Sequence, residues 1–123
     1  MASKNPVVHW ELMGPDGDAQ KAFYESIFDW KLEAPPGFGE YHMVGNDEVG
    51  VGGAVGKGSE EMPSYSAIYV QVDSIDETLA QVESNGGKTL VKRTEIPDTV
   101  IYGLFSDPAG NIVGLVEPDE NMD

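Results

Sequence analysis

The chain has 123 residues, of which 40% are hydrophobic and 24% charged, so its length and composition suit a single globular domain. It contains 22 acidic and seven basic residues, a net charge of −15, which argues against nucleic acid or an anionic membrane surface as a partner. No cysteine is present, which excludes disulfides, thiolate metal sites and cysteine nucleophiles.

The N-terminal residues lack the apolar core of a signal peptide, and no apolar run approaches the length of a membrane span. We therefore expect a cytoplasmic protein without a membrane partner. The acidic composition predicts a well-solvated, self-repelling surface. An alternative interpretation is adaptation to high salt, in which screening reduces the self-repulsion.

The first predicted element is a strand at residues 7–12 with two different faces. Side chains alternate across a strand, so the apolar Val8, Trp10 and Leu12 share one side. Val7, His9 and Glu11 share the other side, which carries an imidazole and a carboxylate two residues apart. We expect the apolar side, with Trp10, to pack against a helix.

A turn cluster at residues 13–18 leads into a helix with apolar residues at helical spacing from Ala19 onward. Asp16 or Asp18 can cap this helix. Short strands are then predicted at residues 30–33, 41–44 and 49–55, with a hairpin turn at residues 45–47.

The second half repeats this order after a polar linker at about residues 57–63. A strand is predicted at residues 65–72, and Ser74 with Glu77 forms a capping box for the following helix. Asn85-Gly86-Gly87 ends that helix. Three more strands are predicted at residues 89–91, 99–105 and 112–116.

The repeat has a period near 58 residues, in which His9 corresponds to Ala67. One unit of this size has a single sheet face to bury, so two units sharing a core are expected. The predicted modules cover about residues 6–56 and 64–118 of one domain.

Several short motifs in this order resemble the vicinal oxygen chelate superfamily, which includes glyoxalase I, bleomycin-resistance proteins and extradiol dioxygenases. The motifs are His9 fifteen residues before Tyr24, Val72-Asp73, Asn85-Gly86-Gly87 and Asp107-Pro108-Ala109-Gly110-Asn111. The resemblance implies an α+β fold in which two βαβββ modules form a curled mixed sheet around a cavity, with the helices outside. It also implies a homodimer.

Two further stretches, at residues 10–13 and 94–97, resemble a subgroup of glyoxalase-like proteins that often carry two such domains in one chain.

In metal-dependent members of that superfamily, four strand positions supply the ligands. Carried over to this chain, they fall on His9, Ala67, Gly114 and the glycine-rich residues 50–56, so one ligand of four is present. Glu11 adds at most a second ligand, and firm binding of a divalent metal needs three or four. We therefore expect no metal and no other cofactor. The alternative is a divalent metal near His9 and Glu11, completed by a partner or by the ligand.

The glycine-rich residues 50–58 resemble a phosphate-binding loop only superficially. Val51 stands where a P-loop requires its first glycine, and Gly58 stands where serine or threonine should follow the lysine. We interpret this run as a strand in a tight curve, where glycine permits close approach.

Strand alternation predicts the residues that line the cavity. They are Val7, His9 and Glu11 from the first strand, Ala67, Tyr69 and Gln71 from the fifth, and Gly114 from the last. The seventh strand contributes Tyr102 and Leu104, or alternatively Gly103 and Phe105. We expect this lining to bind a small, partly apolar organic molecule.

If the protein is an enzyme, we expect His9 to act as general acid or base, with Glu11 orienting it or raising its pKa. The alternatives are a non-enzymatic resistance or sequestration protein, a metal-dependent lyase or dioxygenase, and a structural or regulatory module without a ligand.

Overall fold

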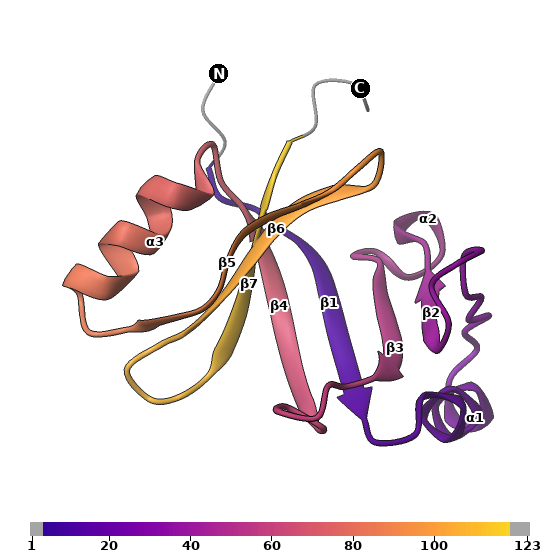
Figure 1. Cartoon of the computed structure of the whole chain (residues 1–123). Helices are drawn as coiled ribbons and strands as arrows, with labels where there is room; N and C mark the ends of the chain where they lie inside the picture. The colour runs from indigo at the N-terminus through magenta and orange to yellow at the C-terminus, as the bar shows by residue number, and fades with distance from the viewer. Residues whose placement is uncertain (1–3, 119–123) are drawn as a thin grey trace. The chain divides into compact units, whose positions relative to one another are not determined.

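The computed structural model describes residues 4–118, and these form a mixed α+β fold (Figure 1). The described residues fall into two compact units. The N-terminal unit comprises His9–Ala67, and the C-terminal unit comprises residues 4–8 with residues 68–118. No helix of the described residues has both the length and the apolar character required to span a bilayer.

The N-terminal unit is built on three strands and two helices. They are β1 (Val7–Gly14, whose first two residues belong to the other unit), α1 (Gly17–Ile27), β2 (Tyr41–Val44), α2 (Asn46–Val49) and β3 (Gly53–Lys57). Strand β3 lies in the middle, because it pairs parallel with β1 and antiparallel with β2. Helix α1 packs next to β2 and β3 (Figure 1).

One face of these strands packs against the helix, as the alternation in β1 predicts. Its core contains Leu32, Val44 and Val55, joined by partly buried residues that include Trp10, Leu12 and Tyr24. Tyr24 comes from α1, so the prediction that Trp10 joins the sheet to a helix is confirmed. His9 and Glu11 lie on the opposite face of the same strand.

Gly53 shows why the third strand is rich in glycine. It lies opposite Trp10 in the parallel pair of β1 and β3, and a Cβ atom at this position would overlap the indole ring. The ring therefore occupies the volume that a side chain would need. Of the run at residues 50–58, only Gly53–Lys57 forms a strand, and in that part the interpretation of a close approach to glycine holds at Gly53.

The predicted strand at residues 30–33 is largely absent. Only Glu33 pairs, in an isolated antiparallel bridge with Met43. The backbone N–H of Leu32 instead donates to the Glu25 carboxylate at 3.0 Å, and the Trp30 ring packs 5.2 Å from Trp10. These contacts with α1 and with the core replace a strand ladder.

The predicted hairpin turn at residues 45–47 is wrong as well. The chain forms the short helix α2 from Asn46, and Gly50, with a φ of 90°, ends it. A positive φ at that point is accessible to glycine at little cost, so the helix can stop abruptly. Strand β3 consequently begins at Gly53 and not at residue 49.

The C-terminal unit follows the predicted strand–helix–three strands order. It contains β4 (Tyr65–Gln71, whose first three residues belong to the other unit), α3 (Ile75–Ser84), β5 (Lys88–Ile96), β6 (Val100–Ser106) and β7 (Ile112–Glu117). Strand β7 pairs parallel with β4 and antiparallel with β6, and β6 pairs antiparallel with β5.

Helix α3 begins as its capping sequence predicts, because the Ser74 hydroxyl accepts a hydrogen bond from the Glu77 N–H at 3.1 Å. Its residues Ile75 and Leu79 are buried with Val72 and Leu115 in the core of this unit. Strand β5 is longer than the predicted residues 89–91, and its pairing with β6 shifts register twice. These irregularities interrupt the alternation that would have marked the whole strand.

The register of β6 and β7 decides which residues share a face. Leu104 lies opposite Gly114, and Tyr102 lies opposite Val116. Phe105 packs against the core under α3, and a Cβ atom at Gly103 would contact Ile75. Of the two alternatives for this strand, Tyr102 and Leu104 therefore lie on the face away from the helix.

Candidate functional site

Four polar side chains of the N-terminal unit form one hydrogen-bonded chain, which we call the Glu11 cluster: His9, Glu11, Tyr41 and Tyr65. The Tyr41 hydroxyl donates to Glu11 Oε2 at 2.5 Å, and the Tyr65 hydroxyl donates to Glu11 Oε1 at 3.2 Å. His9 Nε2 lies 2.9 Å from the Tyr41 oxygen. Each carboxylate oxygen of Glu11 therefore accepts a hydrogen bond from a tyrosine hydroxyl.

The fold brings these residues together from three strands. His9 and Glu11 lie two residues apart on β1, Tyr41 is the first residue of β2, and Tyr65 is the first residue of β4. Tyr41 reaches Glu11 across β3, where the small residues Ala54 and Gly56 lie opposite Glu11 and Tyr41. A larger side chain on this face of β3 would stand between the phenol and the carboxylate.

Counting protons assigns the direction of each hydrogen bond. A phenol has one proton, and the Tyr41 hydroxyl donates it to the hydrogen bond with Glu11 Oε2. The bond between His9 and Tyr41 must then be donated by His9 Nε2. Burial lowers the pKa of His9, and the negative charge of Glu11 only partly offsets this effect. His9 is therefore a neutral imidazole near pH 7, with its proton on Nε2.

Tyr41 stays protonated for the same reasons. Burial is the main cause that raises the pKa of Tyr41, and the charge and hydrogen bond of Glu11 raise it further. Glu11 itself is 6% exposed. Each hydrogen bond missing from a buried carboxylate costs about 1–3 kcal/mol, so the bonds from the two phenols stabilise Glu11 at this position.

His9, Glu11 and their neighbours do not fit the divalent metal centre expected for metal-dependent members of the superfamily. Among residues 4–118, no group of three or more His, Cys, Asp and Glu side chains could hold a metal ion. His9 and Glu11 are also already bonded to tyrosine hydroxyls through Nε2 and both carboxylate oxygens. A divalent cation would have to displace these phenols and would still have only two side-chain ligands.

The remaining residues of the predicted lining belong mostly to the C-terminal unit. Tyr69 and Leu104 are buried, and Tyr102 and Gln71 are partly buried. A Cβ atom at Gly114 would overlap the Tyr69 ring, so the space beside this glycine holds that ring. Val7 is 43% exposed.

Tyr41 and Tyr65 are the cluster members that sequence reasoning missed. Alternation along residues 41–44 places Tyr41 and Met43 on one face and His42 and Val44 on the other. That pattern, combined with the position of β2 beside β3, could have indicated that Tyr41 faces the same side as Glu11.

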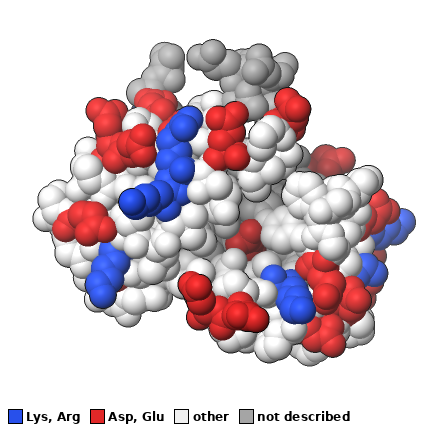
Figure 2. All heavy atoms as spheres, viewed as in Figure 1, with Lys and Arg blue, Asp and Glu red and all other residues white. Residues whose placement is uncertain are grey.

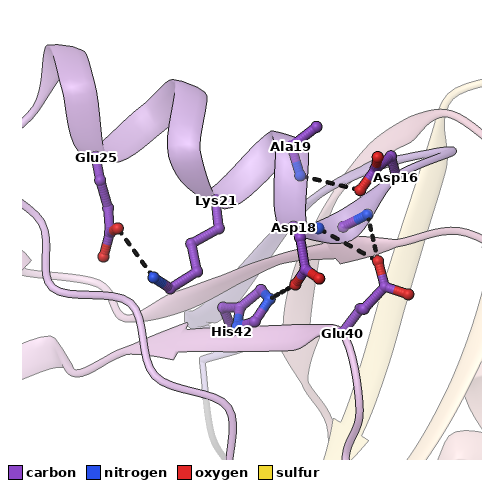
Figure 3. A network of polar contacts seen from close by, with 8 residues as sticks. Asp16, Asp18, Ala19, Lys21, Glu25, Glu40 and His42 are labelled. Atoms are coloured by element: carbon purple, nitrogen blue, oxygen red, sulfur yellow. Dashed lines mark hydrogen bonds and ion pairs between the residues drawn. The ribbon is translucent and has the colours of Figure 1, made fainter.

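His42 lies on the other face of β2. It is buried, and its Nε2 lies 3.1 Å from Asp18 Oδ1 (Figure 3). Glu40 accepts hydrogen bonds from the N–H groups of Gly17 and Asp18, and Asp16 caps α1 through the N–H of Ala19 (Figure 3). This network attaches the start of α1 to β2 on the face opposite the Glu11 cluster.

Acidic side chains are spread over the face shown in Figure 2, with basic side chains between them. The only arginine, Arg93, makes two hydrogen bonds to Glu117 at 3.0 and 3.1 Å.

Residues 7–115 match the sequence profile of the Glyoxalase/Bleomycin resistance protein/Dioxygenase superfamily. The chain belongs to this superfamily. The match confirms the family that the short motifs indicate, and with it the α+β fold. A superfamily member from Vibrio splendidus has a similar structure, with a TM-score of 0.64 and 15% identity over 94% of this chain and all of that one.

Two curated relatives match over most of the chain. A putative glyoxylase, CFP32, from Mycobacterium bovis is 29% identical over 118 residues, which cover 91% of this chain and 45% of that protein. The anthracycline biosynthesis protein DnrV from Streptomyces peucetius is 26% identical over 82% of this chain and 42% of its own length. The chain thus spans about half the length of these relatives.

Proposed function

We propose that this superfamily member binds a small organic molecule on the strand face that carries the Glu11 cluster, and that it does so without a metal. One observation carries the proposal: Tyr41 stands between His9 and Glu11 and bonds to both. In a metal centre these two side chains would converge on the cation. Here they are linked through a phenol and present a polar group of defined protonation to a ligand.

The cluster supports proton transfer as well as binding. A neutral imidazole can take a proton from a ligand, and the imidazolium would keep its Nε2–H bond to the Tyr41 oxygen. Glu11, two bonds further along, would then offset the new positive charge. His9 is the proposed general base, and Tyr41 and Glu11 are the residues that position it and stabilise its charged form.

Binding without turnover is the second candidate, of the resistance or sequestration type. The name of the relative DnrV places that protein in anthracycline biosynthesis, so an anthracycline is a reasonable probe for this chain. The name of CFP32 suggests a second probe, the hemithioacetal of methylglyoxal and glutathione. The homodimer and the cytoplasmic location expected from the sequence remain predictions.

The test is a thermal-shift assay of chelator-treated protein with daunorubicin, with the hemithioacetal and with a panel of small hydroxyl- and carbonyl-bearing compounds. We expect at least one compound to raise the melting temperature without added metal, and Tyr41→Phe to reduce that rise. Tyr24→Phe, a matched change in the aromatic core on the other face, should leave it unchanged. Stabilisation by no compound, or only after addition of zinc or manganese, would contradict the proposal.

Turnover separates the two candidates. Loss of the hemithioacetal in the presence of wild-type protein, abolished in His9→Gln, would identify an enzyme. Ligand-dependent stabilisation without any chemical change in the ligand would identify a binding protein.

A further inference from the structure

Phe38 places an aromatic ring directly beside the Glu11 cluster. Its ring centroid lies 6.2 Å from that of Tyr41, and the His9 imidazole is stacked with Tyr41 at a centroid distance of 6.4 Å. The Tyr41 ring therefore adjoins both other rings, with an interplanar angle of 42° to Phe38 and 25° to His9. We call Phe38, Tyr41 and His9 the aromatic shelf.

The loop before β2 presents Phe38 between two glycines. Gly37 has a φ of 85° and Gly39 a φ of 59°, and a Cβ atom at either position would meet nothing within 4 Å. The Phe38 N–H donates to the Pro35 carbonyl at 3.1 Å, which closes the turn. The ring thus projects from a short turn whose two glycines are uncrowded, and it is 38% exposed.

Exposure alone does not distinguish Phe38, because Phe23 and Phe28 on the α1 side are more exposed. The distinguishing feature is the ring contact with Tyr41, whose hydroxyl bonds to both His9 and Glu11. Phe23 and Phe28 contact only rings of the helix-side core, Tyr24 and Trp30, in the ring pairs of this unit.

We propose that Phe38 is a specificity-determining residue that makes the site selective for planar aromatic ligands. The inference rests on the proposed function, because it names the ligand class of the same site. A flat π-system stacks against the aromatic shelf, while its hydroxyl or carbonyl substituents reach the polar atoms of the Glu11 cluster. Aromatic rings favour offset stacking with other rings, so an aliphatic ligand of equal size gains less from this surface.

The experiment is a fluorescence titration of chelator-treated protein with daunorubicin, a planar polycyclic probe with hydroxyl and carbonyl substituents. Phe38→Ala should weaken binding about tenfold, the effect expected for loss of one stacking partner. Phe38→Leu keeps an apolar side chain but not a flat ring, and should weaken binding by an intermediate factor. Phe28→Ala removes a ring that is more exposed than Phe38 but lies on the α1 side, and it is the control, with unchanged affinity expected. Equal affinity of Phe38→Ala and wild-type protein would overturn the inference.

The hemithioacetal probe separates this inference from the proposed function, because it has no aromatic ring. Its stabilisation should fall in Tyr41→Phe and stay unchanged in Phe38→Ala. If the hemithioacetal binds and daunorubicin does not, the proposed function stands and the selectivity for planar ligands is wrong. If no probe binds at all, both proposals are wrong.

Discussion

Tyr41 and Glu11 are hydrogen-bonded across an intervening strand. Tyr41 lies on β2 and Glu11 on β1, and β3 pairs with both, so the phenol spans the width of β3 to reach the carboxylate. Small residues on the facing positions of β3 make this contact possible. This bond uses the one proton of the Tyr41 hydroxyl. The Tyr41 oxygen can therefore only accept a hydrogen bond from His9.

Tyr41→Phe should lower the free energy of unfolding by about 1–3 kcal/mol, because it removes one donor from a buried carboxylate and the acceptor of His9. Urea unfolding monitored by circular dichroism measures the change. Tyr24→Phe is the matched control and should cost less. Equal stability of wild-type protein and Tyr41→Phe would show that the phenol is not needed to hold Glu11.

His9 should make stability depend on pH in a predictable direction. Its pKa is lowered in the folded protein, mainly by burial, from an ordinary value of 6.5. The unfolded chain therefore takes up a proton first as the pH falls below that value, which favours unfolding. Above this range the titration of His9 does not change the free energy of unfolding. Below it, the free energy of unfolding falls with pH until the pH passes the lowered pKa.

The variant His9→Gln isolates this dependence. Wild-type protein should lose stability relative to His9→Gln as the pH falls from about 7.5 to 5, by urea unfolding at each pH. A difference that is constant over this range would mean that His9 titrates alike in the folded and unfolded states.

Glu117 should stabilise the C-terminal unit from two directions. Its Oε2 accepts the Ile75 N–H at the start of α3 at 2.8 Å, and both carboxylate oxygens accept from Arg93. Burial opposes ionisation, but the bonds to Arg93 and Ile75 outweigh it and lower the pKa of Glu117. Glu117→Gln should therefore cost about 1 kcal/mol of unfolding free energy at neutral pH.

The matched control for Glu117 is Glu95→Gln, an exposed change in β5, which should have little effect. Arg93→Ala should destabilise less than Glu117→Gln, because the guanidinium is exposed and its ion pair is screened by water. The opposite ranking would mean that the ion pair, and not the bond to the helix, dominates.

Gly53→Ala should destabilise the N-terminal unit by about 1–3 kcal/mol, because the added methyl group overlaps the Trp10 ring. Thermal unfolding measures the loss. The double variant with Trp10→Leu tests the cause, since a smaller side chain at position 10 should make the cost of Gly53→Ala smaller. Strict additivity of the two changes would rule out the contact as the source.

Much of the fold could be predicted because its signals are local. Capping by Ser74 and the packing of Trp10 and Leu12 on the helix side of β1 follow from neighbouring residues, and both are as predicted. The strand expected at residues 30–33 was wrong for a non-local reason. Its backbone and Trp30 are held by α1 and by Trp10, and no pattern within four residues contains that information.

Two of the four residues of the Glu11 cluster could be predicted from the sequence. His9 and Glu11 could be paired because they are two residues apart on one strand, but Tyr41 lies 30 residues from Glu11 and Tyr65 lies 54. The strand order that joins them depends on pairings that single-strand patterns do not encode. The burial of His42 is also non-local, because its ring lies against Asp18 of α1.

We propose that His9 and Glu11 are hydrogen-bonded to tyrosine hydroxyls and do not bind a metal. Nitrogen-15 NMR of the imidazole rings tests this directly. The chain has only two histidines, so His9→Gln assigns both sets of signals. In chelator-treated protein near pH 7, His9 should be the neutral tautomer with its proton on Nε2, and about one equivalent of zinc should leave its signals unchanged. Stoichiometric loss of the Nε2 proton on addition of zinc would show that His9 is a metal ligand and would contradict a metal-free site.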